Sequence, residues 1–265
     1  MSITKSQLKS IKALSTSKGR KQTGLFVAEG VRLIEEAVRH RIKPVQLYFA
    51  PSLLSERGKA LVEEFGRKKI TMFETSAREL NSMSATQTPQ GIIAAFSIPD
   101  CRLAQLYRPN YRKILWCENI SDPGNLGTLA RSALAFGFDP VILTGNSADP
   151  WSPKVVRASA GAIFGLHLTR ETTDEALAFA DRNKFAIVAT GVKGKKLDYS
   201  LKKQFEKAKL ILAVGSEADG LSEEVKRKAG LFVRIDHSGE VESLNAAVAG
   251  SILMNMLYEG TGAGQ

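Results

Sequence analysis

Short apolar runs alternate with amphipathic stretches along almost the whole chain. The runs are rich in Val, Ile, Leu and Phe and indicate strands, whereas the stretches between them space their apolar residues as a helix does. In the first half, strands are expected at 25–27, 45–49, 70–73 and 91–96, with helices over 29–40, over 52–67 and from Ser76 onward. This alternation predicts an α/β fold.

The alternation starts again after residue 112. Strands are expected at 113–117, 140–143, 185–189, 210–214 and 231–235. Strands separated by helices favour a mainly parallel sheet, whose ligands bind beyond the carboxyl ends of the strands. Residues 98–112 are polar and contain two prolines, as a linker does. We therefore predict a smaller N-terminal α/β domain over 1–105 and a second domain over 110–265.

The charge of the chain indicates a polyanionic partner. Its 265 residues carry a formal net charge of +10, with a pI near 9.6. RNA, DNA and an anionic membrane are all compatible with this charge. Residues 1–24 contain no acidic residue and several basic ones, so this segment is predicted to contact the polyanion. Its basic residues are Lys5, Lys9, Lys12, Lys18, Arg20 and Lys21.

Several other classes of protein do not fit the sequence. No stretch approaches the roughly 20 apolar residues of a membrane span, and no signal-peptide core follows Met1. Two cysteines are too few for a disulfide framework, and the three histidines lack the spacing of metal ligands. We therefore expect a cytoplasmic protein that holds no metal and does not associate with a membrane.

Three polar loops follow expected strands of the second half. The loop 118–124 leads into a helix that contains Asn125 and Arg131, where an amide and a guanidinium could face one substrate. The loop after Val214 places Glu217 between Gly215 and Gly220. Read singly, the first loop is slightly better explained as an ordinary turn and helix cap with a solvated arginine. The second is equally well explained as a loop whose acids balance a helix dipole.

The third loop follows the strand 231–235. It leads to Ser243, Leu244 and Asn245 at the start of a helix rich in small residues. A serine and an asparagine here are either N-cap residues or neutral groups that orient a hydroxyl. Position alone slightly favours the cap.

Together the three loops resemble, in order and spacing, the three motifs of the SpoU (TrmH) family of RNA 2′-O-ribose methyltransferases. The motifs are the loop with Asn125 and Arg131, the run Gly-Ser-Glu-x-x-Gly-Leu-Ser from Gly215, and Ser-Leu-Asn from Ser243. The runs 26–30 and 86–91 resemble the substrate-binding domain of the same family. A rival dinucleotide-binding oxidoreductase is disfavoured because no Gly-x-Gly-x-x-Gly opens a helix.

The resemblance implies a C-terminal α/β knot, in which a trefoil-knotted, mainly parallel sheet binds S-adenosylmethionine. The implied cofactor-binding residues come from three loops. They are Thr190, Gly191, Gly215, Ser216, Ile235, Ser243 and Leu244. The implied catalytic residues are Arg131, Asn125, Glu217, Ser243 and Asn245, with Arg131 acting either as the general base or, because arginine stays protonated, as a phosphate clamp.

The resemblance also implies a homodimer formed through the knotted domain, in which the partner chain supplies part of each RNA site. The N-terminal domain resembles RNA-binding folds of ribosomal proteins. Its expected RNA contacts are Lys18, Arg20, Lys21 and Arg32, and Arg131 would add one from the catalytic domain. Ribosomal RNA is the expected substrate; the alternatives are transfer RNA and a non-catalytic RNA-binding or ribosome-assembly factor.

Overall fold

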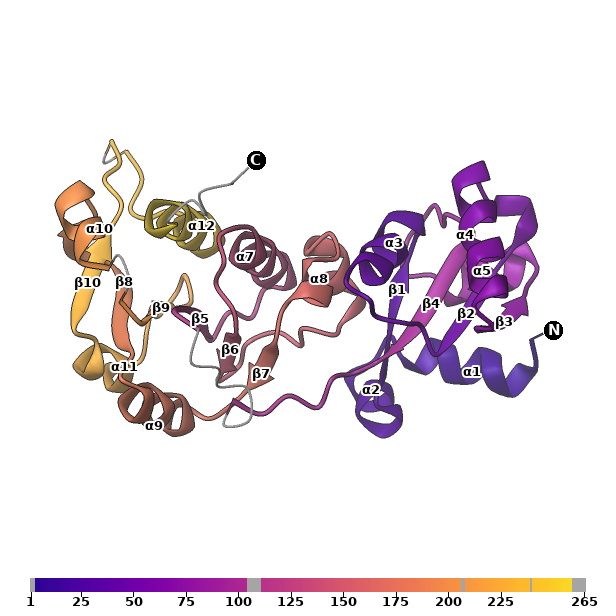
Figure 1. Cartoon of the computed structure of the whole chain (residues 1–265), viewed down its shortest axis with the longest axis horizontal. Coiled ribbons are helices and arrows are strands. Elements are labelled where there is room, and N and C mark those ends of the chain that lie inside the picture. The colour runs from indigo at the N-terminus through magenta and orange to yellow at the C-terminus, as the bar shows by residue number, and fades with distance from the viewer. Residues whose placement is uncertain (1–2, 104–110, 206–207, 239, 259–265) are drawn as a thin grey trace. The chain divides into compact units, whose positions relative to one another are not determined.

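A computed structural model of the chain describes residues 3–103, 111–205, 208–238 and 240–258, and it divides into two compact units (Figure 1). Unit 1 contains residues 1–100 and 149–165, and unit 2 contains residues 101–148 and 166–265. Of the predicted linker 98–112, residues 104–110 lie outside the described residues. Each unit is built around its own sheet.

Unit 1 has a four-stranded sheet in the order β1-β4-β2-β3. Strand β4 is antiparallel to β1 and β2, whereas β2 and β3 are parallel. The strands are β1 (Leu25–Glu29), β2 (Gln46–Phe49), β3 (Thr71–Glu74) and β4 (Ile92–Ser97), and the helices before β4 are α1 (Lys5–Ala13), α2 (Ser17–Thr23), α3 (Val31–Arg39), η1 (Pro51–Leu53), α4 (Glu56–Arg67) and α5 (Ala77–Met83).

Unit 1 also contains a segment that the sequence places within the second domain. Residues 149–165, with α8 (Pro153–Ala158) and η2 (Ala162–Gly165), pack on unit 1 although they follow a strand of unit 2. The ring of Trp151 lies 4.8 Å from that of Phe26, and the ring of Phe164 lies 5.1 Å from that of Phe96. These aromatic contacts bury apolar area against unit 1, whereas the sequence pattern placed the segment in the second domain.

Unit 2 has a six-stranded sheet in the order β10-β8-β9-β5-β6-β7, and all of its described pairings are parallel. The mainly parallel α/β fold is therefore confirmed. The strands are β5 (Lys113–Glu118), β6 (Val141–Thr144), β7 (Leu168–Arg170), β8 (Ala186–Lys196), β9 (Leu210–Val214) and β10 (Leu231–Arg234). The helices are α7 (Pro123–Ala135), α9 (Thr173–Asn183), α10 (Tyr199–Phe205), α11 (Glu223–Lys228) and α12 (Ala246–Leu257).

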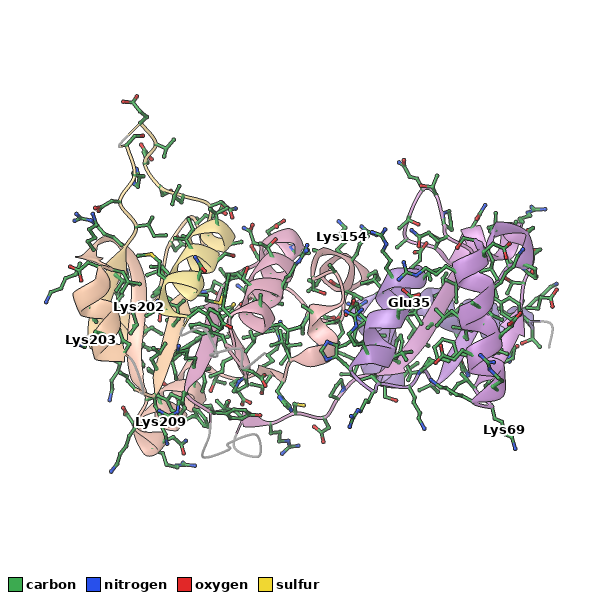
Figure 2. The ribbon with its side chains drawn as sticks, turned by 45° about the horizontal axis from the view of Figure 1, so that its top comes forward. Glu35, Lys69, Lys154, Lys202, Lys203 and Lys209 are labelled. Atoms are coloured by element: carbon green, nitrogen blue, oxygen red, sulfur yellow. The ribbon has the colours of Figure 1, made fainter. Side chains whose placement is uncertain are left out.

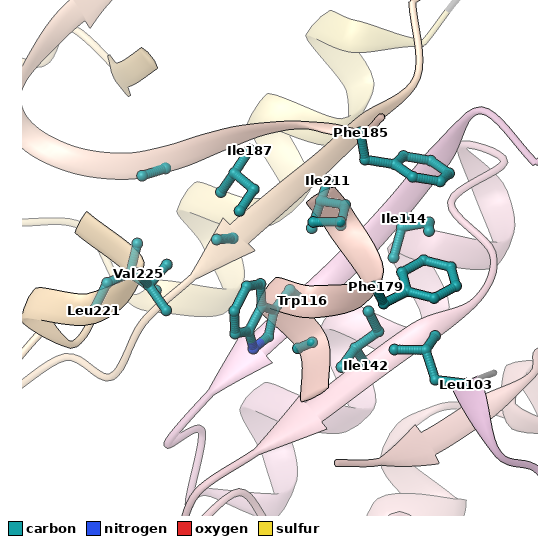
Figure 3. Close-up of a cluster of buried hydrophobic side chains, with 14 residues drawn as sticks. Leu103, Ile114, Trp116, Ile142, Phe179, Phe185, Ile187, Ile211, Leu221 and Val225 are labelled. Atoms are coloured by element: carbon teal, nitrogen blue, oxygen red, sulfur yellow. The ribbon is translucent and has the colours of Figure 1, made fainter. Parts of the chain in front are cut away.

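Helices cover both faces of this sheet, with α7 and α12 on one side and α9 and α11 on the other (Figure 1). Figure 3 shows the core beneath α9 and α11, where Trp116 of β5 is fully buried next to Val225 of α11. The Trp116 Nε1 donates a hydrogen bond of 2.9 Å to Thr144 Oγ1, so the indole is buried without an unsatisfied donor. This core holds the carboxyl ends of β5 and β9 side by side.

The structure differs from the sequence pattern at two strands. Strand β7 has three residues, too few to show a periodicity, and was not predicted. Strand β8 continues seven residues beyond the predicted end at residue 189 and reaches Lys196. The strand pairings do not establish the path of a knot, which stays a prediction from the resemblance. Within the described residues, no helix is long and apolar enough to cross a membrane.

Candidate active site

The loop after β9 is tightly closed. The backbone N–H of Ser216 donates to the Gly220 carbonyl at 3.1 Å, and the Gly220 N–H donates back to the Ser216 carbonyl at 3.0 Å. A Cβ on Gly215 would lie 2.2 Å from the Gly220 carbonyl carbon, closer than side chains approach, so this position requires glycine. The closed loop directs Glu217 toward the starts of two helices.

Three predicted residues meet through the carboxylate of Glu217. Its Oε1 accepts a hydrogen bond from Asn125 Nδ2 at 2.9 Å, another from Asn245 Nδ2, and one from the Ala246 N–H at 3.3 Å. Asn245 Nδ2 also donates to Asn125 Oδ1 at 2.9 Å. The three motif residues therefore form one hydrogen-bonded cluster, which we call the Asn-Glu-Asn cluster (Asn125, Glu217, Asn245).

Asn245 is also the N-cap of α12, which is one of its two predicted roles; that it orients a hydroxyl stays a prediction. Its Oδ1 accepts from the N–H groups of Ala247 and Val248 at 3.0 and 3.1 Å, as the N-cap of α12. With the oxygen used by the helix, the amide nitrogen must point toward Asn125 and Glu217. Capping thus fixes the orientation of the group that joins the cluster.

A cavity of about 740 Å³ lies beside this cluster. All seven predicted cofactor residues line it, namely Thr190, Gly191, Gly215, Ser216, Ile235, Ser243 and Leu244. Its wall combines apolar side chains such as Val214 and Leu253 with residues of the loops after β9 and β10. Thr190 and Gly191, which the sequence placed in a loop after a strand ending at residue 189, lie within β8. Size and lining fit a nucleoside-sized ligand held partly by main-chain hydrogen bonds.

The cavity wall also carries charged residues that sequence analysis did not assign. Arg234 and Asp236 are among them, alongside the predicted Glu217. Lys196 Nζ lies 2.9 Å from one oxygen of Asp236, and Arg234 Nε lies 3.0 Å from the other. These hydrogen bonds, from Lys196 first and then Arg234, lower the pKa of Asp236. The carboxylate therefore stays ionised at neutral pH.

Glu118 is a buried acid that sequence analysis also missed. It ends β5 and is 2% exposed. Its oxygens accept hydrogen bonds from the Ser222 N–H at 2.7 Å and the Ser222 Oγ at 2.9 Å. The sequence signal that could have found it is an acid directly after the apolar run 114–117, because a carboxylate buried there needs hydrogen-bond partners. Through Ser222, the N-cap of α11, Glu118 ties the loop 215–220 to β5.

Glu118→Gln is expected to lower the free energy of unfolding by about 1–3 kcal/mol, because an amide NH₂ would face two donors in a buried place. Urea titration followed by circular dichroism measures this change. Glu224→Gln serves as the control, since Glu224 is exposed on α11. An unchanged unfolding midpoint in Glu118→Gln would contradict the structural role of the acid.

Arg131 stands apart from the cavity. It lies on α7, is exposed, and does not belong to the cavity lining. Within the described part of the chain its guanidinium has no hydrogen bond or ion pair. The cluster and the cavity of one chain are thus assembled without Arg131, although sequence analysis placed it in the same catalytic group.

The predicted RNA contacts of unit 1 differ in exposure. Lys18, Lys21 and Arg32 are exposed, whereas Arg20 is 3% exposed. The Arg20 guanidinium donates to the Leu14 carbonyl at 2.8 Å and, from Nε, to Asp149 Oδ2 at 2.9 Å. Because Arg20 is buried and has two hydrogen-bond partners, it cannot contact an RNA phosphate, and its prediction as an RNA contact is wrong. Its guanidinium instead joins α2 to the segment 149–165.

Comparison with known families identifies the catalytic half. The SpoU rRNA methylase family matches residues 112–255, more than half of the chain. The chain belongs to this family. The substrate-binding domain of MRM3-like proteins matches residues 5–94.

Relatives of the SpoU family resemble the chain over nearly its whole length. The 23S rRNA (guanosine(2553)-2′-O)-methyltransferase RlmP of Bacillus subtilis is 30% identical to this chain, and the alignment covers 94% of each of the two chains. An uncharacterised tRNA/rRNA methyltransferase of Synechocystis is 31% identical over 97% of this chain and 92% of its own. A crystal structure of AdoMet-bound rRNA methyltransferase from Sinorhizobium meliloti, 28% identical, has a TM-score of 0.83 and covers 97% of this chain and 95% of its own.

The SpoU motifs account for the polar loops of unit 2. Among the described residues no group of three His, Cys, Asp or Glu side chains is placed to hold a metal ion. Burial raises the pKa of the Cys117 thiol, so this cysteine stays protonated inside the sheet.

Proposed function

We propose that this SpoU protein transfers a methyl group from S-adenosylmethionine to a ribose 2′-hydroxyl of ribosomal RNA. One observation carries the proposal: the cavity lined by all seven expected cofactor residues adjoins the Asn-Glu-Asn cluster. The AdoMet-bound relative and the 2′-O-methyltransferase relative support the same cofactor and the same position on the ribose.

The chain's own residues supply binding and alignment. S-adenosylmethionine brings an activated methyl group on a sulfonium, so the protein mainly has to hold a hydroxyl in line with it. Thr190 and Gly191, within β8, and Leu244, in the loop before α12, would hold the cofactor. Ser243 lines the cavity and offers a neutral hydroxyl, which can orient the ribose without titrating. Glu217 keeps the cluster in one arrangement.

Arg131 acts, in this proposal, from the partner subunit of a homodimer. Within one chain the arginine is exposed and lies away from the cavity. Helices α7 and α12 pack against each other through a hydrogen bond of 2.7 Å between Ser132 and Ser251, and Val248 of α12 is exposed. A dimer through this knotted domain would cover Val248 and bring Arg131 to the other chain's cavity, where it clamps an RNA phosphate.

The test measures cofactor binding and methyl transfer separately. Calorimetry should detect S-adenosylmethionine binding and no NAD binding. A radiolabelled methyl group should be transferred to large-subunit ribosomal RNA. When 2′-O-methyl sites are mapped in cells with and without the gene, cells without it should lack the methyl group at one position of their cytoplasmic ribosomal RNA. A lost transfer RNA mark would instead establish the tRNA enzyme, and cofactor-free RNA binding without transfer would establish the non-catalytic factor.

A further inference from the structure

The segment 149–165 gives unit 1 a charged surface of its own. Asp149 accepts from Arg20, and Trp151 and Phe164 pack on Phe26 and Phe96, so α8 is held firmly on β1. Val155 and Val156 of α8 are buried, whereas Lys154 and Arg157 are exposed. Three positions apart on a helix, these two cations lie on the same face. Figure 2 shows Lys154 on this helix.

Neither cation has a partner in the described part of the chain. Lys154 and Arg157 make no side-chain hydrogen bond or ion pair there, and α8 itself contains no acidic residue. By contrast, Arg57 of α4, also in unit 1, is paired with Glu35. Unpaired charge of one sign on a fixed helix suits a ligand of the opposite sign.

A small cavity of about 30 Å³ shows which residues surround Arg157. Arg157, Glu29, Leu33 and Ala85 all line it. The carboxylate of Glu29, which lines the same cavity, accepts hydrogen bonds from the Ala85 N–H at 3.0 Å, from Thr86 Oγ1 at 2.6 Å and from the Ser84 hydroxyl. None of these hydrogen bonds comes from Arg157, and the two side chains form no ion pair within the described residues.

The same hydrogen bonds fix the loop 84–90. Gln90 Oε1 further accepts from the Val31 N–H at 3.2 Å, at the start of α3. With both ends held, Gln87 and Thr88 remain exposed. Arg32 follows Val31 and is exposed too. The loop 84–90 is thus connected to α8 through the cavity that Ala85 and Arg157 line, and to the start of α3 through Gln90. We call the exposed polar residues of these three elements the α8 surface (Lys154, Arg157, Arg32, Gln87, Thr88).

We propose that the α8 surface binds the RNA substrate, with Lys154 and Arg157 contacting phosphates and the loop 84–90 contacting sugars or base edges. This inference rests on the proposed function and adds residues that the sequence assigns to the catalytic domain. RNA is favoured over an acidic protein because the large apolar side chains exposed in the described residues, Val45, Val241 and Val248, all lie outside this surface.

The test compares two double variants by filter binding to large-subunit ribosomal RNA. Lys154→Gln/Arg157→Gln should weaken binding about 10-fold and reduce the slope of log affinity against log salt by about 0.7–0.9 for each phosphate that the two cations neutralise. The control, Arg67→Gln/Lys69→Gln, removes two exposed cations beside β3, at the opposite edge of the sheet from β1. It should leave affinity and slope unchanged. Figure 2 labels Lys69.

Two further measurements separate this proposal from its foundation. Both variants should bind S-adenosylmethionine as the wild type does, and Lys154→Arg/Arg157→Lys should retain RNA affinity because it keeps the charge. If the test and control variants lost RNA affinity equally, or if neither lost any, the α8 surface would not be an RNA-binding surface. Methyl transfer by the wild type would still support the proposed function in that case. Absence of RNA binding by the wild type would overturn both.

Discussion

Arg131→Ala is expected to reduce methyl transfer to RNA about 1,000-fold while leaving the affinity for S-adenosylmethionine within a few-fold of the wild type. The guanidinium lies outside the cofactor cavity, so cofactor binding does not require it. Arginine stays protonated and can hold a phosphate with two parallel hydrogen bonds, which lysine cannot do. Arg131→Lys should therefore recover only part of the rate. Single-turnover transfer and calorimetry measure the two quantities.

Mixing inactive subunits tests where Arg131 acts. If the arginine serves the partner's cavity, a dimer of one Arg131→Ala chain and one Glu217→Gln chain contains one intact site. Random exchange makes half of the dimers mixed, so about a quarter of the wild-type activity should return. If the mixture of the two variants stayed inactive, Arg131 would serve the site of its own chain, or the protein would not form the dimer. Full transfer by Arg131→Ala alone would remove the residue from catalysis.

Glu217→Gln is expected to lower the rate of methyl transfer about 100-fold, because a small displacement of aligned groups has an effect of this size. The Oε1 of Glu217 accepts from Asn125, Asn245 and Ala246 at once. A glutamine places an NH₂ group among these donors, and the cluster loses its single arrangement. Rates at saturating cofactor and RNA measure the effect on the chemical step.

Glu224→Gln is the matched control for Glu217→Gln, since Glu224 is an exposed acid on α11, in the same segment between β9 and β10. It should retain the wild-type rate. If Glu217→Gln stayed within threefold of the wild type, the cluster would serve only to cap α12. In that case Asn245 alone would account for the stability of the helix start, through its bonds to Ala247 and Val248.

Several features of the site were predictable from local sequence. Glu217 could be placed after a strand because five apolar residues precede Gly215, and Ser222 could be recognised as the N-cap of α11. Asn245 was predicted either to cap α12 or to orient a hydroxyl, and its two ends serve the cap and the cluster. The burial of Arg20 was not predictable, because nothing within residues 1–24 reveals Asp149.

The sequence by itself determined the order of strands and helices and the three polar loops, since hydrophobic period and turn residues act over a few positions. The resemblance of these loops to the SpoU motifs, and not the local pattern, indicated that Asn125, Glu217 and Asn245 belong to one site. Only the tertiary structure decided that one carboxylate oxygen joins residues 92 and 28 positions away. It also decided that residues 149–165 belong to unit 1 and that Arg131 lies away from the cavity, because such contacts depend on packing between elements distant along the chain.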